Sequence, residues 1–270
     1  MNRTSHPRLR PLSRPGHEPH RGRAKGLTLV ELLVVIAILS TLAALLLPAT
    51  SRFRTKTQIQ TARLEIDQIA TAVAEYESIY GRFPVSREAI RAAAIRSDDL
   101  TYGGVIEETH TWLAGPGSYL TNNCELMAVL LDLEYYGDGA PTINQGHVRN
   151  PRSERFLTAP TSDATNAAPG LGIDGVYRDP WGSPYLVTLD FNGDGHARDV
   201  LYREPAVSAN PQNPDLGLRG LVRRFDAQGN AVFEATAPVM VWSTGPDRRV
   251  DTREKADQGV NRDNILSWSR

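Results

Sequence analysis

The feature that most constrains this chain is an apolar run near its N-terminus, from Leu27 to Leu47. Its 21 residues contain one charged side chain, Glu31. As a helix, at about 1.5 Å per residue, the run is long enough to cross the roughly 30 Å hydrocarbon layer of a bilayer. A secretory signal peptide has a shorter apolar core and ends at a small-residue cleavage site, which "LLLPAT" matches poorly. The sequence therefore predicts a membrane-spanning helix.

Charge is distributed unevenly along the chain. Residues 1–25 carry seven Lys or Arg and one acid, which leaves 23 basic and 30 acidic residues in 26–270. Basic residues before an apolar run favour a cytoplasmic N-terminus, so the body is expected on the other side of the membrane. The acidic body argues against nucleic acid as a partner.

Helical periodicity continues beyond the apolar run. Apolar residues recur at spacings of three and four at Ile59, Ala62, Ile66, Ile69, Val73, Tyr76 and Tyr80. The pattern predicts one helix of about 54 residues, kinked near Pro48 and ended by Gly81 and Pro84.

The rest of the chain predicts shorter elements. Ser86 is a candidate cap for a helix reaching Arg96, and Asn122 or Asn123 for a helix over 124–133. Short β signals separated by turns begin at Tyr177. The expected strands are 185–189, 200–203, 231–235 and 238–243. The predicted fold class is α+β, with the long helix packed on a small antiparallel sheet and a loop-rich insertion.

The N-terminal segment "KGLTLVELLVVIAILSTLAALLLPA" resembles the cleavage and methylation segment of type IV pilins and type II secretion pseudopilins. The resemblance implies cleavage by a prepilin peptidase after Gly26 and N-methylation of Leu27. It also implies that Glu31 assists assembly and that Pro48 kinks the helix. Leu27 stands where phenylalanine is more usual.

Three downstream segments are also similar to major pseudopilins: "YESIYGRFP", "DPWGSPY" and the C-terminal "WSTGPDRRVDTREKADQGVNRDNILSW". Residues 85–176, between the first two of these segments, match nothing in that family. The resulting division is a leader (1–26), a membrane half of the helix (27–47), an amphipathic half (48–84), an insertion (85–176) and a β-rich region (177–270).

Glu31 is costly inside hydrocarbon, where an unpaired carboxylate is penalised by several kcal/mol. One explanation is that its side chain reaches back to the headgroups. The other is that the amine freed at Leu27 of one subunit neutralises Glu31 of its neighbour in a filament. The second explanation links cleavage to assembly.

Oxygen-bearing side chains crowd the C-terminal segment, at Asp247, Asp251, Asp257, Asn261, Asp263 and Asn264. Calcium takes six to eight oxygen ligands, and the resemblance implies a calcium loop here, with Asp247, Asp251 and Asp263 as ligands. The alternative is a charged loop in which interleaved arginines pair with these acids. Arg248 stands where the family has glycine.

A second candidate calcium loop is "DFNGDGHARD", with Asp190, Asn192 and Asp194 at alternate positions. It opens like an EF-hand, but position twelve is Leu201 instead of a bidentate glutamate. A tight turn is the competing interpretation, and "NGDG" suits one.

No catalytic motif is present: the sequence lacks H-E-x-x-H, G-x-S-x-G and phosphate-binding glycine loops, and Cys124 is the only cysteine. No enzyme activity and no required cofactor are therefore expected, calcium being the one candidate. The resemblance implies a subunit of a pseudopilus or pilus-like filament of the bacterial inner membrane and periplasm. It does not distinguish among secretion, adhesion, motility and DNA uptake. Its implied partners are further copies, minor pseudopilins, the peptidase and a membrane assembly platform. The alternative is a membrane-anchored module that binds a polysaccharide or other ligand through 85–176.

Overall fold

The computed structural model describes residues 28–96, 98–103, 105–106, 111–112, 117–119, 122–162 and 168–269. The chain divides into two units between Thr50 and Ser51. The second unit contains all the sheets.

The long helix α1 runs from Leu29 to Tyr80 and has 52 residues, continuing through position 48. It ends at Gly81, whose φ of +63° belongs to the left-handed region and whose N–H bonds to the carbonyl of Glu77 at 2.7 Å. The predicted single helix and its glycine cap are confirmed, while the kink at Pro48 stays a prediction. Among the helices formed by the described residues, none combines the length and apolar character needed to cross a membrane.

Two short helices follow. In α2 (Arg87–Arg96) the hydroxyl of Ser86 accepts the N–H of Ala89 at 3.1 Å, which is the expected N-terminal cap. In α3 (Cys124–Leu130) the Asn122 side chain accepts the first N–H at 3.1 Å. Both helices begin where the sequence predicted them to begin.

The main sheet has five strands in the order β11-β10-β7-β1-β4. Their bounds are β1 Leu100–Tyr102, β4 Ser118–Tyr119, β7 Leu186–Leu189, β10 Val239–Ser243 and β11 Ile265–Leu266. The pairs are antiparallel except β1 with β4, which is parallel. Strands β1 and β4 come from the region 85–176, so part of that region is built into the sheet.

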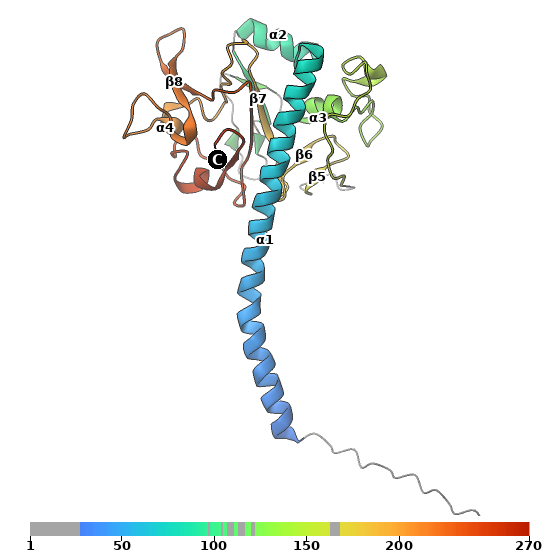
Figure 1. Ribbon diagram of the computed structural model, residues 1–270, viewed down its shortest axis with the longest axis vertical. Helices are drawn as coiled ribbons and strands as arrows, with labels where there is room; N and C mark the ends of the chain where they lie inside the picture. Colours follow the sequence, from blue (N-terminus) through green and yellow to red (C-terminus); the bar gives the residue numbers. More distant parts are fainter. Residues whose placement is uncertain are drawn as a thin grey trace, which may run out of the picture. The chain divides into compact units, whose positions relative to one another are not determined.

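Smaller elements complete the second unit. Three two-stranded sheets pair β2 (Val105–Ile106) with β3 (Thr111–Trp112), β5 (Gly170–Leu171) with β6 (Tyr177–Arg178), and β8 (Val222–Phe225) with β9 (Ala231–Glu234). The helical turns are α4 (Pro205–Ser208) and three 3₁₀ turns at Gln145–His147, Leu218–Gly220 and Gly259–Asp263. Figure 1 shows α3, β5 and β6 on one side of the C-terminal half of α1, and β8 and α4 on the other.

Both faces of the main sheet are buried, because side chains of a strand alternate between its faces. On one face, Val187 and Val241 pack with the buried stripe of α1 in a single core cluster. On the other face, Leu186 and Trp242 form a second cluster with Tyr202. The second cluster is covered by the loops after β7 and by the β8–β9 hairpin, without any long helix.

The predicted strand 200–203 is wrong. Its apolar residues are buried, but the carboxylate of Asp199 accepts the N–H groups of Leu201 and Tyr202 at 2.9 and 3.0 Å. These amides are therefore lost to any β ladder, and the segment forms turns. The other three predicted strands correspond to β7, β9 and β10.

Candidate functional site

The processing residues Gly26 and Leu27 lie outside the described residues, so the predicted cleavage and methylation stay predictions. Pro48 lies within α1, and its predicted role in assembly likewise stays a prediction. Glu31 is described, in the first turn of the helix.

Glu31 and Thr28 form a reciprocal helix cap. The carboxylate oxygen Oε2 of Glu31 accepts the backbone N–H of Thr28 at 2.8 Å and its hydroxyl at 2.9 Å. In return, the hydroxyl of Thr28 accepts the N–H of Glu31 at 3.2 Å. This is a capping box, whose T-x-x-E signature stands at 28–31 of the sequence but was not among the predicted helix caps. Glu31 therefore has a structural role in the isolated chain.

Apolar side chains surround Glu31 and remain uncovered. All residues from 28 to 42 are exposed, with Leu29 at 79% and Ile36 at 54% of their full accessible surface. An exposed apolar surface of this extent is typical of a segment made to contact lipid or other protein.

In the C-terminal loop, two carboxylates come close together after β10. The N–H of Asp247 points to Oδ2 of Asp263 at 3.4 Å, and burial together with the nearby Asp247 carboxylate raises the pKa of Asp263. A Cβ on Gly245 would lie 2.3 Å from the carbonyl oxygen of Asp263, so only glycine permits this approach. Asp247 and Asp263 thus lie side by side, while their predicted role as calcium ligands stays a prediction.

Three side-chain oxygens in this loop are buried without a hydrogen-bond partner among the described residues: Thr244 Oγ1, Asp263 Oδ1 and Asn264 Oδ1. Unpaired buried acceptors of this kind are what a cation would satisfy. Across the described ranges, however, His, Cys, Asp and Glu form no group of three or more that could hold a metal ion. The loop thus has unpaired buried oxygens, but its described carboxylates do not gather into a group of three, and calcium binding stays a prediction.

Asp251 is held in a different way. Its N–H donates to Oδ1 of Asn261 at 3.0 Å, and its Oδ1 accepts the N–H of Arg253 at 2.8 Å. The amide of Asn261 also donates to the carbonyls of Asp251 and Glu254. This part of the loop is therefore held by hydrogen bonds within the protein.

Arg248 occupies the position where the resemblance implied glycine. Its φ is +57°, a left-handed conformation that costs a side chain other than glycine about 1 kcal/mol. The backbone conformation expected of glycine is therefore present despite the substitution.

The loop after β7 is organised around Asp190. Its two oxygens accept the N–H groups of Gly193 and Gly195, each at 2.7 Å, and Asn192 Oδ1 accepts the N–H of Asp194 at 2.9 Å. Side-chain bonds to local backbone amides are typical of a tight turn. Calcium binding at Asp190, Asn192 and Asp194 stays a prediction.

Glu65 is a buried carboxylate on the apolar stripe of α1, 9% exposed. The hydroxyl of Tyr185 donates to its Oε2, and burial raises its pKa. The sequence offered one signal for its burial: Glu65 lies three residues after Ala62 and four before Ile69, both of the buried stripe.

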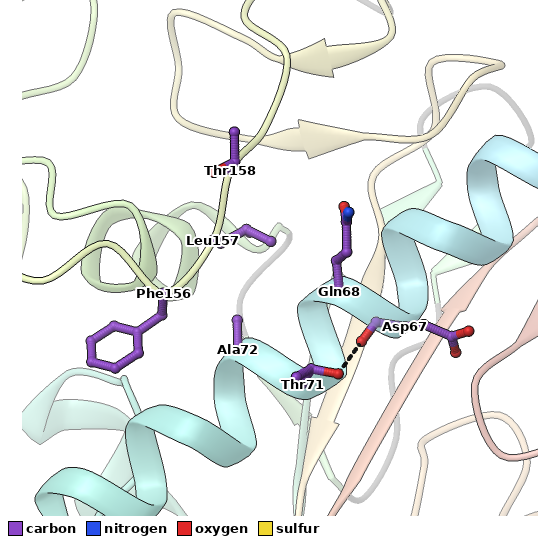
Figure 2. Close-up of a pocket in the computed structure, with 7 residues that line it drawn as sticks. All are labelled: Asp67, Gln68, Thr71, Ala72, Phe156, Leu157 and Thr158. Carbon is purple, nitrogen blue, oxygen red and sulfur yellow. Dashed lines mark hydrogen bonds between the residues drawn. The ribbon is translucent and has the colours of Figure 1, made fainter.

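A shallow groove of about 350 Å³ lies between α1 and the segment 156–158. Figure 2 shows Gln68 and Ala72 of α1 across from Leu157. Thr71, in the same groove, donates its hydroxyl to the carbonyl of Asp67 at 2.7 Å. Phe156 packs edge-on against Tyr76, so the groove wall belongs to the core.

Comparison with known proteins finds matches to part of the chain. The model for the prokaryotic N-terminal methylation motif matches residues 21–47. The type IV major pilin protein PilE1 of Neisseria gonorrhoeae is 38% identical over 74 residues, 27% of this chain and 45% of that protein. A fimbrial protein of Neisseria meningitidis serogroup A is 37% identical over 70 residues, 26% of this chain and 41% of that protein. No solved structure matches significantly.

The chain carries a prepilin-type N-terminal methylation motif at residues 21–47, and over about a quarter of its length it is similar to type IV pilins. It spans less than half the length of the pilins quoted above. The matched motif at 21–47 overlaps the start of the long helix α1 (Leu29–Tyr80).

Proposed function

We propose that the chain is a structural subunit of a type II secretion pseudopilus or a type IV pilus-like filament. It is made with a basic leader, cleaved after Gly26 and methylated at Leu27 before it assembles. The observation that carries the proposal is the methylation motif matched at 21–47, which coincides with an α1 segment whose apolar side chains are exposed through residue 42.

Assembly is driven by pairing of Glu31 with the amine of a neighbouring subunit. In the described segment both bonds from Thr28 go to Oε2 of Glu31, and no described residue donates to Oε1. Oε1 can therefore accept an ammonium group while the helix cap stays intact. Pairing removes the penalty of an isolated charge in hydrocarbon, which favours packed helices over separate ones.

The pairing is tested with two substitutions at one position. Glu31→Gln keeps the capping box, because glutamine also serves at this position, and removes only the charge. Glu31→Ala removes both. We expect both variants to be inserted and cleaved but to yield at least about tenfold fewer filaments by electron microscopy, as expected if a charge-assisted contact is lost. Normal filaments from Glu31→Gln would show that Glu31 serves only as a cap.

Processing is tested by mass spectrometry of the mature N-terminus. The expected species begins with methylated Leu27. An uncut leader, or a cut after Ala49 as a signal peptidase would make, contradicts the filament proposal.

The proposal places the subunit in the bacterial inner membrane through residues 27–47, with the N-terminus cytoplasmic and the body periplasmic. Its partners are other copies, minor pseudopilins, the prepilin peptidase and an assembly platform driven by a separate cytoplasmic ATPase. The chain itself performs no catalysis in this scheme.

A second function is binding of a polysaccharide or other surface ligand through residues 85–176. The observation that favours it is a cavity lined largely by that region, including Arg87 and Arg149. Ligand binding by the chain in cells that form no filaments would make this the primary function.

We also propose that calcium binds the C-terminal loop at Asp247 and Asp263, with Thr244 and Asn264 as further oxygen donors. The support is the buried, unpaired oxygens at three of these residues. If calcium binds, adding a chelator lowers the melting temperature of the wild type and leaves Asp263→Asn unchanged. An equal response of both proteins to chelator contradicts calcium at this loop.

A further inference from the structure

A cavity of about 410 Å³ opens between the end of α1, the start of α2 and the segment 143–149. Its lining residues are Arg82, Ser86, Arg87, Glu88, Ile143, Val148 and Arg149. Three arginines against one glutamate make its wall positively charged on a body that is otherwise acidic.

Arg149 is the unusual member of this set. It is only 8% exposed, yet its guanidinium makes no hydrogen bond or ion pair with any described residue. Its backbone is well held: the carbonyl accepts from the hydroxyl of Tyr76 and from Arg82 Nη2, and the N–H donates to Asn144. Charged groups with so little access to water are normally paired, so the largely enclosed Arg149 side chain favours an anion as its partner.

The neighbouring charges increase the demand for an anion. Burial and the cations of Arg82 and Arg87 lower the pKa of Arg149, although Glu88 and Tyr76 act in the opposite direction. Arg82 donates to the backbone carbonyl of Arg149 at 3.1 Å, and both residues line the cavity. A concave wall of one charge sign concentrates counter-ions.

The start of α2 adds a further attraction. Ser86 caps this ten-residue helix, and Ser86, Arg87 and Glu88 all line the cavity. The N-terminus of a helix carries partial positive charge and exposed N–H groups, which favour anions.

We propose that this cavity binds an oxyanion, namely a phosphate or sulfate group carried by a small molecule. Arginine forks match the geometry of such oxygens and bind them by paired, charge-assisted hydrogen bonds. A space of about 410 Å³ also admits more than the anionic group itself, such as a sugar ring. The site is independent of the filament proposal, because none of its residues lies in the N-terminal motif.

The test uses the full mature chain in detergent, titrated with inorganic phosphate, inorganic sulfate and a hexose 6-phosphate at constant ionic strength. Calorimetry should show saturable binding of at least one of the three. Tighter binding of the hexose phosphate would identify a sugar as the carrier, and equal binding would identify the free ion.

Three matched variants decide whether the cavity is responsible. Arg149→Gln and Arg87→Gln are expected to weaken binding about tenfold or more, while Arg91→Gln, exposed on the same helix and outside the cavity, binds as the wild type does. Arg87 is exposed, so its variant remains informative if Arg149→Gln fails to fold.

Two results would overturn the proposal. The first is no saturable binding up to about 10 mM. If filaments are then also lost in Arg87→Gln and Arg149→Gln, the cavity is assigned to a carboxylate of another subunit. The second result is equal binding by all variants.

Discussion

The two halves of α1 share one helical backbone and differ completely in burial. In the N-terminal half every described side chain from 28 to 42 is exposed, and Ile36 is 54% exposed. In the C-terminal half a stripe faces the sheet, and Ile69 is fully buried. An apolar stripe along one face of a helix therefore indicates that this face packs against folded protein. The first half is apolar all round and has no buried stripe, and the second packs on the body with one face only.

The glutamates of the two halves follow the same division. Glu31 is exposed and bonds to Thr28 three residues away, whereas Glu65 is buried and bonds to Tyr185, which is 120 residues away. The first interaction is local, and the second requires the whole body to fold.

The largest expected effect comes from one substitution made in each half. Ile69→Ala should lower the free energy of unfolding of the body by about 2–5 kcal/mol, because it leaves a cavity against the sheet. Ile36→Ala should leave that free energy unchanged. Denaturant titrations followed by tryptophan fluorescence measure both, and similar losses in the two variants would remove the distinction between the halves.

A smaller effect is expected from the buried glutamate. Because burial raises the pKa of Glu65 above its ordinary 4.5, the folded state holds this proton more tightly than the unfolded state. The stability contributed by protonated Glu65 is therefore full below about pH 4.5 and is lost as pH rises through the raised pKa.

Glu65→Gln should accordingly gain stability relative to the wild type between pH 4 and 8, by on the order of 1 kcal/mol. Glu31→Gln, measured by the same unfolding curves across that range, is the control and should show no such trend. A parallel pH profile for wild type and Glu65→Gln would mean that Glu65 stays ionised in the fold.

The smallest effect concerns hydroxyl residues on the exposed surface of α1. Thr71 and Ser40 each donate to a carbonyl four residues earlier, at 2.7 Å. Thr71→Ala should raise the free energy of unfolding by about 0.5 kcal/mol, since alanine is the better helix former in water. Ser40→Ala should not change the unfolding of the body. A loss of stability in Thr71→Ala would indicate that the groove beside it contributes packing.

The elements best predicted from sequence are those defined by local interactions. The length of α1, its end at Gly81 and the Ser86 cap follow from periodicity and capping chemistry within a few residues. Strands β1 and β4 were missed, because segments of two or three residues have no measurable periodicity. Segment 200–203 was assigned wrongly because Asp199, just before it, binds the amides that a strand would use.

The sequence by itself determined the N-terminal half of α1, because the apolar run, Glu31 and its cap depend on neighbours within one helical turn. Only the tertiary structure decided the rest. It joined Asp247 to Asp263, 16 residues apart, and gathered Arg82, Arg87 and Arg149 around one cavity. The physical reason is that capping and periodicity are short-range, whereas the pairing of distant charges depends on which buried faces bring their loops together.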